Sequence, residues 1–127
     1  MTRLERFTLS GDVGGAKSFS IGGRQRRNVQ IITVGIISSA FLVIRGARLN
    51  FQNNNIRLRV QVRGSKRFWQ STSNKEDSPN LNTVLFIESA EAKGVELVIS
   101  AVNTSGNPAT LHPQDGWWLD FVINKQS

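Results

Sequence analysis

Asn55–Arg63 reads NIRLRVQVR and alternates without a break between apolar and polar side chains. The apolar side chains are Ile56, Leu58, Val60 and Val62. The polar side chains include Arg57, Arg59 and Arg63. Because successive side chains of a β-strand point to opposite faces, the pattern predicts a strand with one face in a core. The opposite face of that strand would carry three guanidinium groups.

Short runs of the same kind recur along the chain, rich in Val, Ile, Phe and Trp and separated by Gly, Pro, Asn and Ser. No stretch of ten residues shows a helical apolar period. The predicted strands are Arg3–Leu9, Lys17–Ile21, Asn28–Gly35, Ala40–Arg45, Ile56–Arg63, Lys66–Ser71, Thr83–Glu88, Val95–Val102 and Trp117–Asn124. We therefore predict an all-β fold, a single β-sandwich of jelly-roll or Ig-like type with eight to nine short antiparallel strands. A small closed barrel is the alternative.

The length of 127 residues fits one domain that spans 1–127. The segment 71–80, STSNKEDSPN, contains no large apolar residue and is predicted to be a polar loop. A domain boundary in that loop would leave halves of about 60 residues, which are marginal for independent folding. One sandwich is the more economical organisation.

Residues that carry catalysis or bind metals are sparse. The chain has no cysteine, and its one histidine, His112, lies in the turn segment LHPQDG with Asp115. No nucleophile motif accompanies this pair, and no acidic spacing matches a metal loop. The glycine-rich GDVGGAKS lacks the spacing of a phosphate-binding loop. We expect no enzyme activity and no cofactor or metal.

The longest apolar run, Ile31–Ile44, is 14 residues long and includes Gly35 and two serines. A membrane-spanning helix needs about 20 mainly apolar residues. The run is therefore predicted to form two buried strands joined by a turn, and no membrane association is expected.

Charge is distributed unevenly along the chain. Residues 1–67 hold 13 of the 16 Lys and Arg but two of the nine Asp and Glu, so the first half is basic and the second acidic. Arginine pairs with carboxylates and phosphates in planar, bidentate geometry, so we expect a basic face that contacts a partner. Its predicted members are Arg24, Arg26, Arg27, Arg57, Arg59, Arg63 and Arg67.

An acidic counter-face on a neighbouring copy is one partner for these arginines, in a head-to-tail homo-oligomer. Its predicted members are Glu88, Glu91, Glu96 and Asp120. Single-stranded nucleic acid is another, because alternate strand residues lie about 6.6–6.8 Å apart, close to the spacing of phosphates on an extended strand. Phe68 and Trp69 could then stack on bases.

A glycan is a third candidate partner. In GWWLDFVIN, Trp117 alternates with Trp118, so one tryptophan is expected in the core and the other on a more polar face. Trp118 beside Asp120, with Trp69 elsewhere, could contact a sugar ring or a protein.

Two segments resemble small β-sandwich virion proteins of tailed bacteriophages, the head decoration and accessory structural proteins. The first is TLSGDVGGAKSFSIGGRQRRNVQIITVGIISSAFLVIRGARL, with a short strand, a Gly/Ser turn and a strand that ends in Gly-Gly. The second, GVELVISAVNTSGNPATLHPQDGWWLDFVI, is similar to the closing strands of such sandwiches. The resemblance implies a capsid-associated or assembly subunit, made in the host cytoplasm and carried in the virion. Such a subunit would dock by charge complementarity on a viral capsid protein or on its own copies.

Overall fold

The computed structural model describes residues 2–12, 19–34, 40–63, 66–78, 80–81, 83–87 and 95–126. These ranges contain eleven strands: β1 (Thr2–Asp12), β2 (Phe19–Ile21), β3 (Arg26–Val34), β4 (Ala40–Asn50), β5 (Ile56–Val62), β6 (Phe68–Gln70), β7 (Lys75–Ser78), β8 (Thr83–Ile87), β9 (Val95–Asn103), β10 (Ala109–Leu111) and β11 (Gly116–Gln126). The all-β prediction is confirmed, with more strands than the eight to nine expected. Within the described ranges, no helix has the length and hydropathy needed to cross a bilayer.

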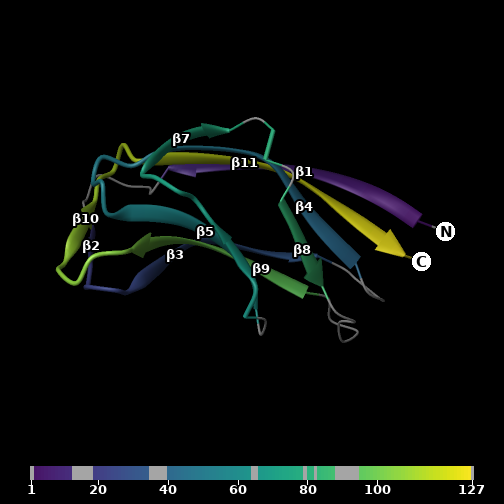
Figure 1. Ribbon diagram of the computed structural model, residues 1–127, viewed down its shortest axis with the longest axis horizontal. Coiled ribbons are helices and arrows are strands. Elements are labelled where there is room, and N and C mark those ends of the chain that lie inside the picture. Colours follow the sequence, from purple (N-terminus) through teal and green to yellow (C-terminus); the bar gives the residue numbers. More distant parts are fainter. Residues whose placement is uncertain are drawn as a thin grey trace.

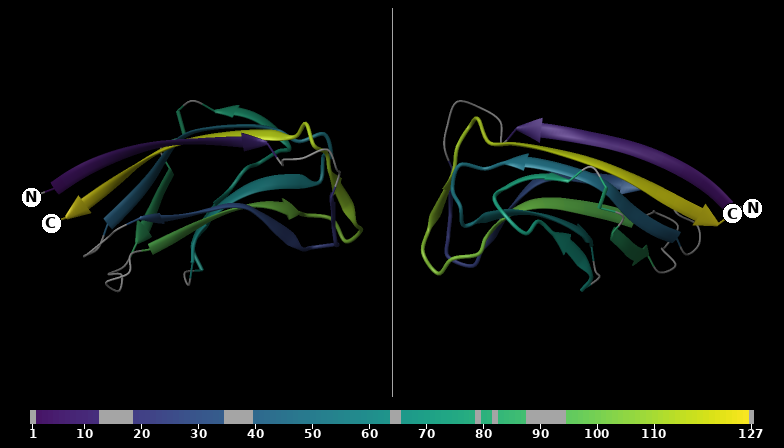
Figure 2. Two further views of the ribbon diagram at one scale, coloured as in Figure 1. Left: turned by 180° about the vertical axis from the view of Figure 1, so that it is seen from behind. Right: turned by 45° about the horizontal axis from the view of Figure 1, so that its top comes forward.

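The strands form two main layers (Figure 1). One layer has the order β1-β11-β4-β7, with β8 also paired to β4, and the other has the order β3-β9-β5-β6. The short β2–β10 pair stands at one end of the two layers, as both views in Figure 2 show. All pairs are antiparallel.

The pairing is nested: β1 with β11, β2 with β10, β3 with β9, β4 with β7 and β8, and β5 with β6. The chain is thus one long hairpin that is rolled up, and the additional pairs β4–β11 and β5–β9 close the roll into two sheets. This connectivity is that of a jelly roll, one of the two sandwich types that the sequence predicts.

The core lies between the two layers. On β5 the burial follows the alternation of the sequence, with Ile56, Leu58, Val60 and Val62 buried and the residues between them partly exposed. The facing sheet contributes the buried Leu42, Ile44, Leu49, Leu119 and Phe121. Two apolar sheet faces therefore cover each other, as a sandwich requires.

Strand β4 continues beyond Arg45, where the sequence predicts its end. Its register with β11 shifts between Asp120 and Phe121, so that Arg45 is the extra residue of a β-bulge. The bulge inverts the alternation: Leu42 and Ile44 are buried before it, and Ala47 and Leu49 after it. A strictly alternating pattern therefore ends at the bulge although the strand does not.

Two short strands lie where the sequence predicts none. Lys75–Ser78 (β7) pairs with the extended end of β4, so the segment 71–80 is not a loop throughout. Ala109–Leu111 (β10) pairs with β2. Edge strands of this length carry too few residues for an alternating apolar pattern to stand out.

Candidate interaction surface

The outward side of the β3-β9-β5-β6 sheet brings four of the predicted arginines together. Arg26 and Arg57 both pair with Val102, from opposite sides of β9. Arg59 pairs with Ser100, and Arg63 bonds through its backbone N to Glu96 O. We call the surface formed by Arg26, Arg57, Arg59 and Arg63 the arginine face.

A second β-bulge shapes this face. The β3–β9 register shifts between Asn28 and Gln30, with Asn28 opposite Ser100 and Ile31 opposite Val98. Asn28 and Ile31 therefore both point outward although they are three residues apart, which the unbroken alternation of a strand would not allow. The side chain of Ile31 is 44% exposed.

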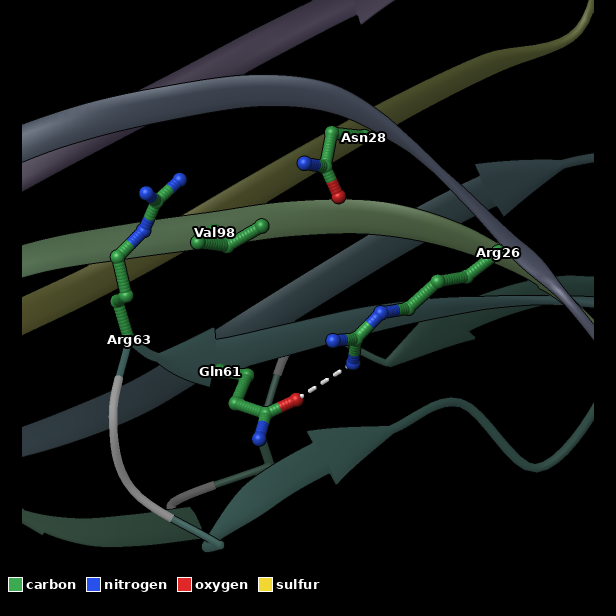
Figure 3. A pocket seen from close by; sticks show the side chains of 5 residues that line it. All are labelled: Arg26, Asn28, Gln61, Arg63 and Val98. Carbon is green, nitrogen blue, oxygen red and sulfur yellow. Dashed lines mark hydrogen bonds between the residues drawn. The ribbon is translucent and has the colours of Figure 1, made fainter.

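A groove of about 440 Å³ lies over β9, one of the two inner strands of this sheet (Figure 3). Arg26, Asn28, Gln61, Arg63 and Val98 line it. The outward residues of β9 are small at Val98 and Ser100, whereas the flanking strands carry long side chains. The groove follows from this difference in side-chain length between the central strand and its neighbours.

Two of the four guanidinium groups are engaged locally. Arg57 donates from Nη1 to the backbone oxygens of Asn54 at 2.7 Å and Ile56 at 3.1 Å. Arg63 forms an ion pair with Glu96, with 2.7 Å between Nε and Oε2. Both side chains thus have acceptors from the same sheet or its adjoining turn.

The other two arginines have neutral partners. Arg26 Nη1 donates to Oε1 of Gln61 at 2.9 Å, and Arg59 Nε donates to Oε1 of Gln70 at 3.0 Å. The guanidinium carbon of Arg59 also lies 3.9 Å from the ring centroid of Phe68. Partial burial lowers the pKa of Arg59, and the nearby positive charge of Arg26 lowers it further.

The remaining predicted arginines lie elsewhere. Arg24 has a φ of 62° in the turn before β3, and its Nη1 donates to the backbone oxygen of Thr104 at 2.6 Å. Arg27 is in register with the buried Ala101, so it belongs to the opposite side of the sheet from Arg26. Arg67 is exposed and precedes β6.

The predicted acidic residues do not form one counter-face in the described structure. Glu96 lies within the arginine face and pairs with Arg63. Asp120 lies in the other sheet, is 7% exposed and has Thr8 and Gly46 as register partners. Glu88 and Glu91 lie outside the described residues.

The structure contradicts the prediction that Trp69 offers an aromatic contact surface. Trp69 pairs with the inward-pointing Val60 and is 8% exposed, so it belongs to the core. Phe68, one residue earlier, pairs with Gln61 on the outward face and is 44% exposed. Because neighbouring side chains of β6 point to opposite faces, Phe68 is the exposed aromatic ring and Trp69 the buried one.

The tryptophan pair of β11 divides as predicted. Trp117 is buried in the core, whereas Trp118 is half-buried on the outward side of the other sheet. The guanidinium carbon of Arg48 lies 5.4 Å from the centroid of the Trp118 ring. The ring of Trp118 therefore already has a cationic neighbour. Arg48 itself is held by an ion pair with Asp77 at 2.9 Å.

His112 and Asp115 form a structural turn. The Asp115 carboxylate is fully buried and accepts hydrogen bonds from the backbone N–H groups of Gln52 at 3.1 Å and His112 at 2.9 Å. It thereby joins the turn after β4 to the turn before β11. Within the described ranges, no three His, Asp or Glu side chains cluster in a way that could hold a metal.

Sequence reasoning missed the neutral members of the arginine face. Asn28, Gln61, Gln70 and Ser100 have no distinctive sequence signal, although the alternation of β5 does place Gln61 on the side of its arginines. Their importance comes from cross-strand register, which a single sequence does not reveal.

Comparisons with known proteins found no matching family model and no matching curated protein. Among solved structures, the chain is similar to the VP2 subviral particle of infectious bursal disease virus, with a TM-score of 0.45 and 11% identity over 97% of this chain. A structure of the Gx strain of that virus gives 0.44 and 11% over 97%. A family two carbohydrate esterase from Cellvibrio japonicus gives 0.25 and 11% over 97%.

The chain spans 35 to 37% of the length of these three structures. At these values none of the three bears on what this chain does.

Proposed function

We propose that this chain is a structural subunit of a virus, capsid-associated or shell-forming, that docks through the arginine face on a carboxylate-bearing protein surface. The surface would belong to a shell or to another copy of the chain. The viral assignment is supported by the resemblance to tailed-phage virion proteins and by the use of jelly rolls in viral capsids, which is an argument by fold analogy.

The observation that carries the docking role is the composition of the arginine face. Among the described residues, four arginines share it with Phe68 and Ile31, each 44% exposed, and with one acidic residue, Glu96. Aromatic residues and arginine are enriched at the centres of protein interfaces, where they contribute much of the binding energy. A rigid sheet also holds these side chains in fixed register.

Single-stranded nucleic acid is the competing occupant of the same face. A phosphate track needs several cations that are free along one line. Arg57 bonds to backbone oxygens and Arg63 pairs with Glu96, so half of the face is already engaged. The arrangement favours a protein partner.

The test is light scattering on size-exclusion peaks of nuclease-treated protein, at physiological salt and near 1 M. We expect a discrete oligomer free of nucleic acid, which Arg59→Glu dissociates because it places a carboxylate in the middle of the face. Lys75→Glu is the matched control, since it makes the same charge change at an exposed site on β7 in the other layer.

Two results would contradict the proposal. One is an oligomer that Arg59→Glu leaves unchanged. The other is a monomer that retains nuclease-protected nucleic acid at low salt and releases it at high salt, where screening is stronger.

A further inference from the structure

Arg26 of β3 and Arg59 of β5 approach each other over β9, the strand between them. Arg26 starts opposite Val102 on the β3 side, and its Nη1 reaches Gln61, which lies on β5 opposite Val98. The side chain therefore crosses above β9, as Figure 3 shows for its course toward Gln61. Arg59 projects from β5 at Ser100, between those two register positions.

Among the described residues, no carboxylate balances these two positive charges. Their partners are the amide oxygens of Gln61 and Gln70, which carry no net charge. The acidic residue of this face, Glu96, pairs with Arg63 at the end of β5. Two like charges held together on a sheet destabilise it, and the lowered pKa of Arg59 has the charge of Arg26 among its causes.

A buried hydroxyl lies at the same place. Ser100 is 1% exposed, and its Oγ has no hydrogen-bond partner in the part of the chain that the structure describes. In the register it stands between Asn28 on β3 and Arg59 on β5. A buried donor without a partner costs free energy that a bound acceptor would recover.

The surroundings favour one carboxylate over a row of phosphates. Of the four arginines of the face, Arg57 bonds to backbone oxygens and Arg63 to a carboxylate, whereas the described partners of Arg26 and Arg59 are neutral side chains. Two such guanidinium groups suit one anion held by their forked donors. Val98 lines the groove, and Ile31 and Phe68 form exposed apolar surface in the same cross-strand row.

We propose that Arg26 and Arg59 form a clamp for the carboxylate of a single Asp or Glu side chain on a protein partner, with Ser100 and Asn28 as additional hydrogen-bond donors. The clamp rests on the proposed docking function and specifies its chemistry. Apolar side chains around that carboxylate would contact Ile31 and Phe68.

The experiment titrates the protein with acetate against chloride at constant ionic strength and follows the Nε–H signals of arginine by ¹H–¹⁵N NMR. We expect saturable shifts at Arg26 and Arg59 and none at Arg57, whose guanidinium is bonded to backbone oxygens. Arg26→Gln or Arg59→Gln should weaken acetate binding about tenfold or more, the loss expected for a hydrogen bond to a charged group. Arg45→Gln is the control: it removes an exposed guanidinium on β4, in the other layer, and should leave acetate binding unchanged.

Equal, unsaturable shifts at all exposed arginines would overturn the clamp. A parallel titration with inorganic phosphate would also overturn it, in favour of a phosphate ligand, if phosphate bound at these arginines and acetate did not. Failure of the docking function is separable: acetate would still bind at the clamp, while Arg59→Glu left the oligomer intact. Conversely, Arg59→Glu could dissociate the oligomer while acetate fails to bind. That result would support the docking function and refute the clamp.

Discussion

The side-chain amide of Asn103 donates from Nδ2 to the backbone oxygen of Ile21 at 3.0 Å, and this bond ties the end of β9 to the end of β2. The same nitrogen lies 2.7 Å from Asn107 O, and Oδ1 accepts from the backbone N–H of Ser105 at 3.0 Å. Backbone N of Asn103 bonds to Gln25 O at 2.9 Å. The buried side chain of Asn103 thus holds the loop after β9 against the end of β2, and its backbone N–H holds Gln25, the residue before Arg26.

Asn103→Ala should destabilise the fold by roughly 2–4 kcal/mol, because it leaves the buried backbone oxygen of Ile21 and partly buried groups of the loop after β9 without a partner. Chemical denaturation in urea measures the change. Asn54→Ala is the matched control, since Asn54 is exposed, and it should stay within about 0.5 kcal/mol of the wild type. Equal stability of the two variants would show that the amide of Asn103 does not hold this end of the sandwich together.

Trp69 and Phe68 are neighbours with opposite roles, and paired substitutions should separate them. Trp69→Ala removes a core side chain and should cost about 3–5 kcal/mol of stability. Phe68→Ala should cost less than about 1 kcal/mol yet weaken self-association, because it removes exposed apolar surface and the ring beneath Arg59. Urea denaturation and light scattering give the two readouts. If Phe68→Ala left association at the wild-type level, the apolar part of the docking surface would be wrongly placed.

The sequence predicts the fold class well where strands alternate regularly. The pattern of β5 gives its buried face correctly, and the pattern GWWLDFVIN separates Trp117 from Trp118. Alternation is a local property, so it survives without knowledge of the partner strand. It fails at Arg45, where the bulge inverts the two faces of β4 within one strand.

The site is less predictable than the fold class, because alternation within one strand does not reveal which strands lie next to it. Arg57, Arg59 and Arg63 share a face by alternation alone, and Arg26 joins them through its pairing with β9. The ion pair of Arg63 with Glu96 depends on the β5–β9 neighbourhood, which places an expected counter-charge inside the basic face. Cross-strand register decides these relations, and composition and spacing carry no information about it.

Asp115→Ala should loosen the two turns that the carboxylate joins. The substitution leaves the partly buried N–H groups of Gln52 and His112 without their acceptor, which should cost about 2–3 kcal/mol. Hydrogen exchange should show faster exchange of these two amides. Gln114→Ala, one residue earlier and exposed, is the control and should leave both amides protected. Protection that persists in Asp115→Ala would mean that other groups hold the turns.

Salt should stabilise the wild-type protein more than Arg26→Gln. The folded chain binds the proton of Arg59 less tightly than the unfolded chain does, because burial and Arg26 lower the pKa of Arg59. The charge of Arg59 therefore opposes folding at neutral pH, and stability would rise only in the strongly alkaline range where Arg59 loses its proton. Salt screens the part of this penalty that comes from Arg26. Arg26→Gln removes that part and also gives up one exposed hydrogen bond to Gln61.

Thermal unfolding at about 10 mM and about 0.5 M salt, well below and well above physiological screening, measures this difference. We expect the wild-type midpoint to rise with salt by more than that of Arg26→Gln, with the two proteins within about 1 kcal/mol of each other at low salt. Arg57→Gln should follow the wild type, because the guanidinium of Arg57 is held by the backbone oxygens of Asn54 and Ile56. Identical salt responses in the wild type and Arg26→Gln would mean that the two guanidinium groups do not repel each other, and the electrostatic reason for an anion between them would be lost.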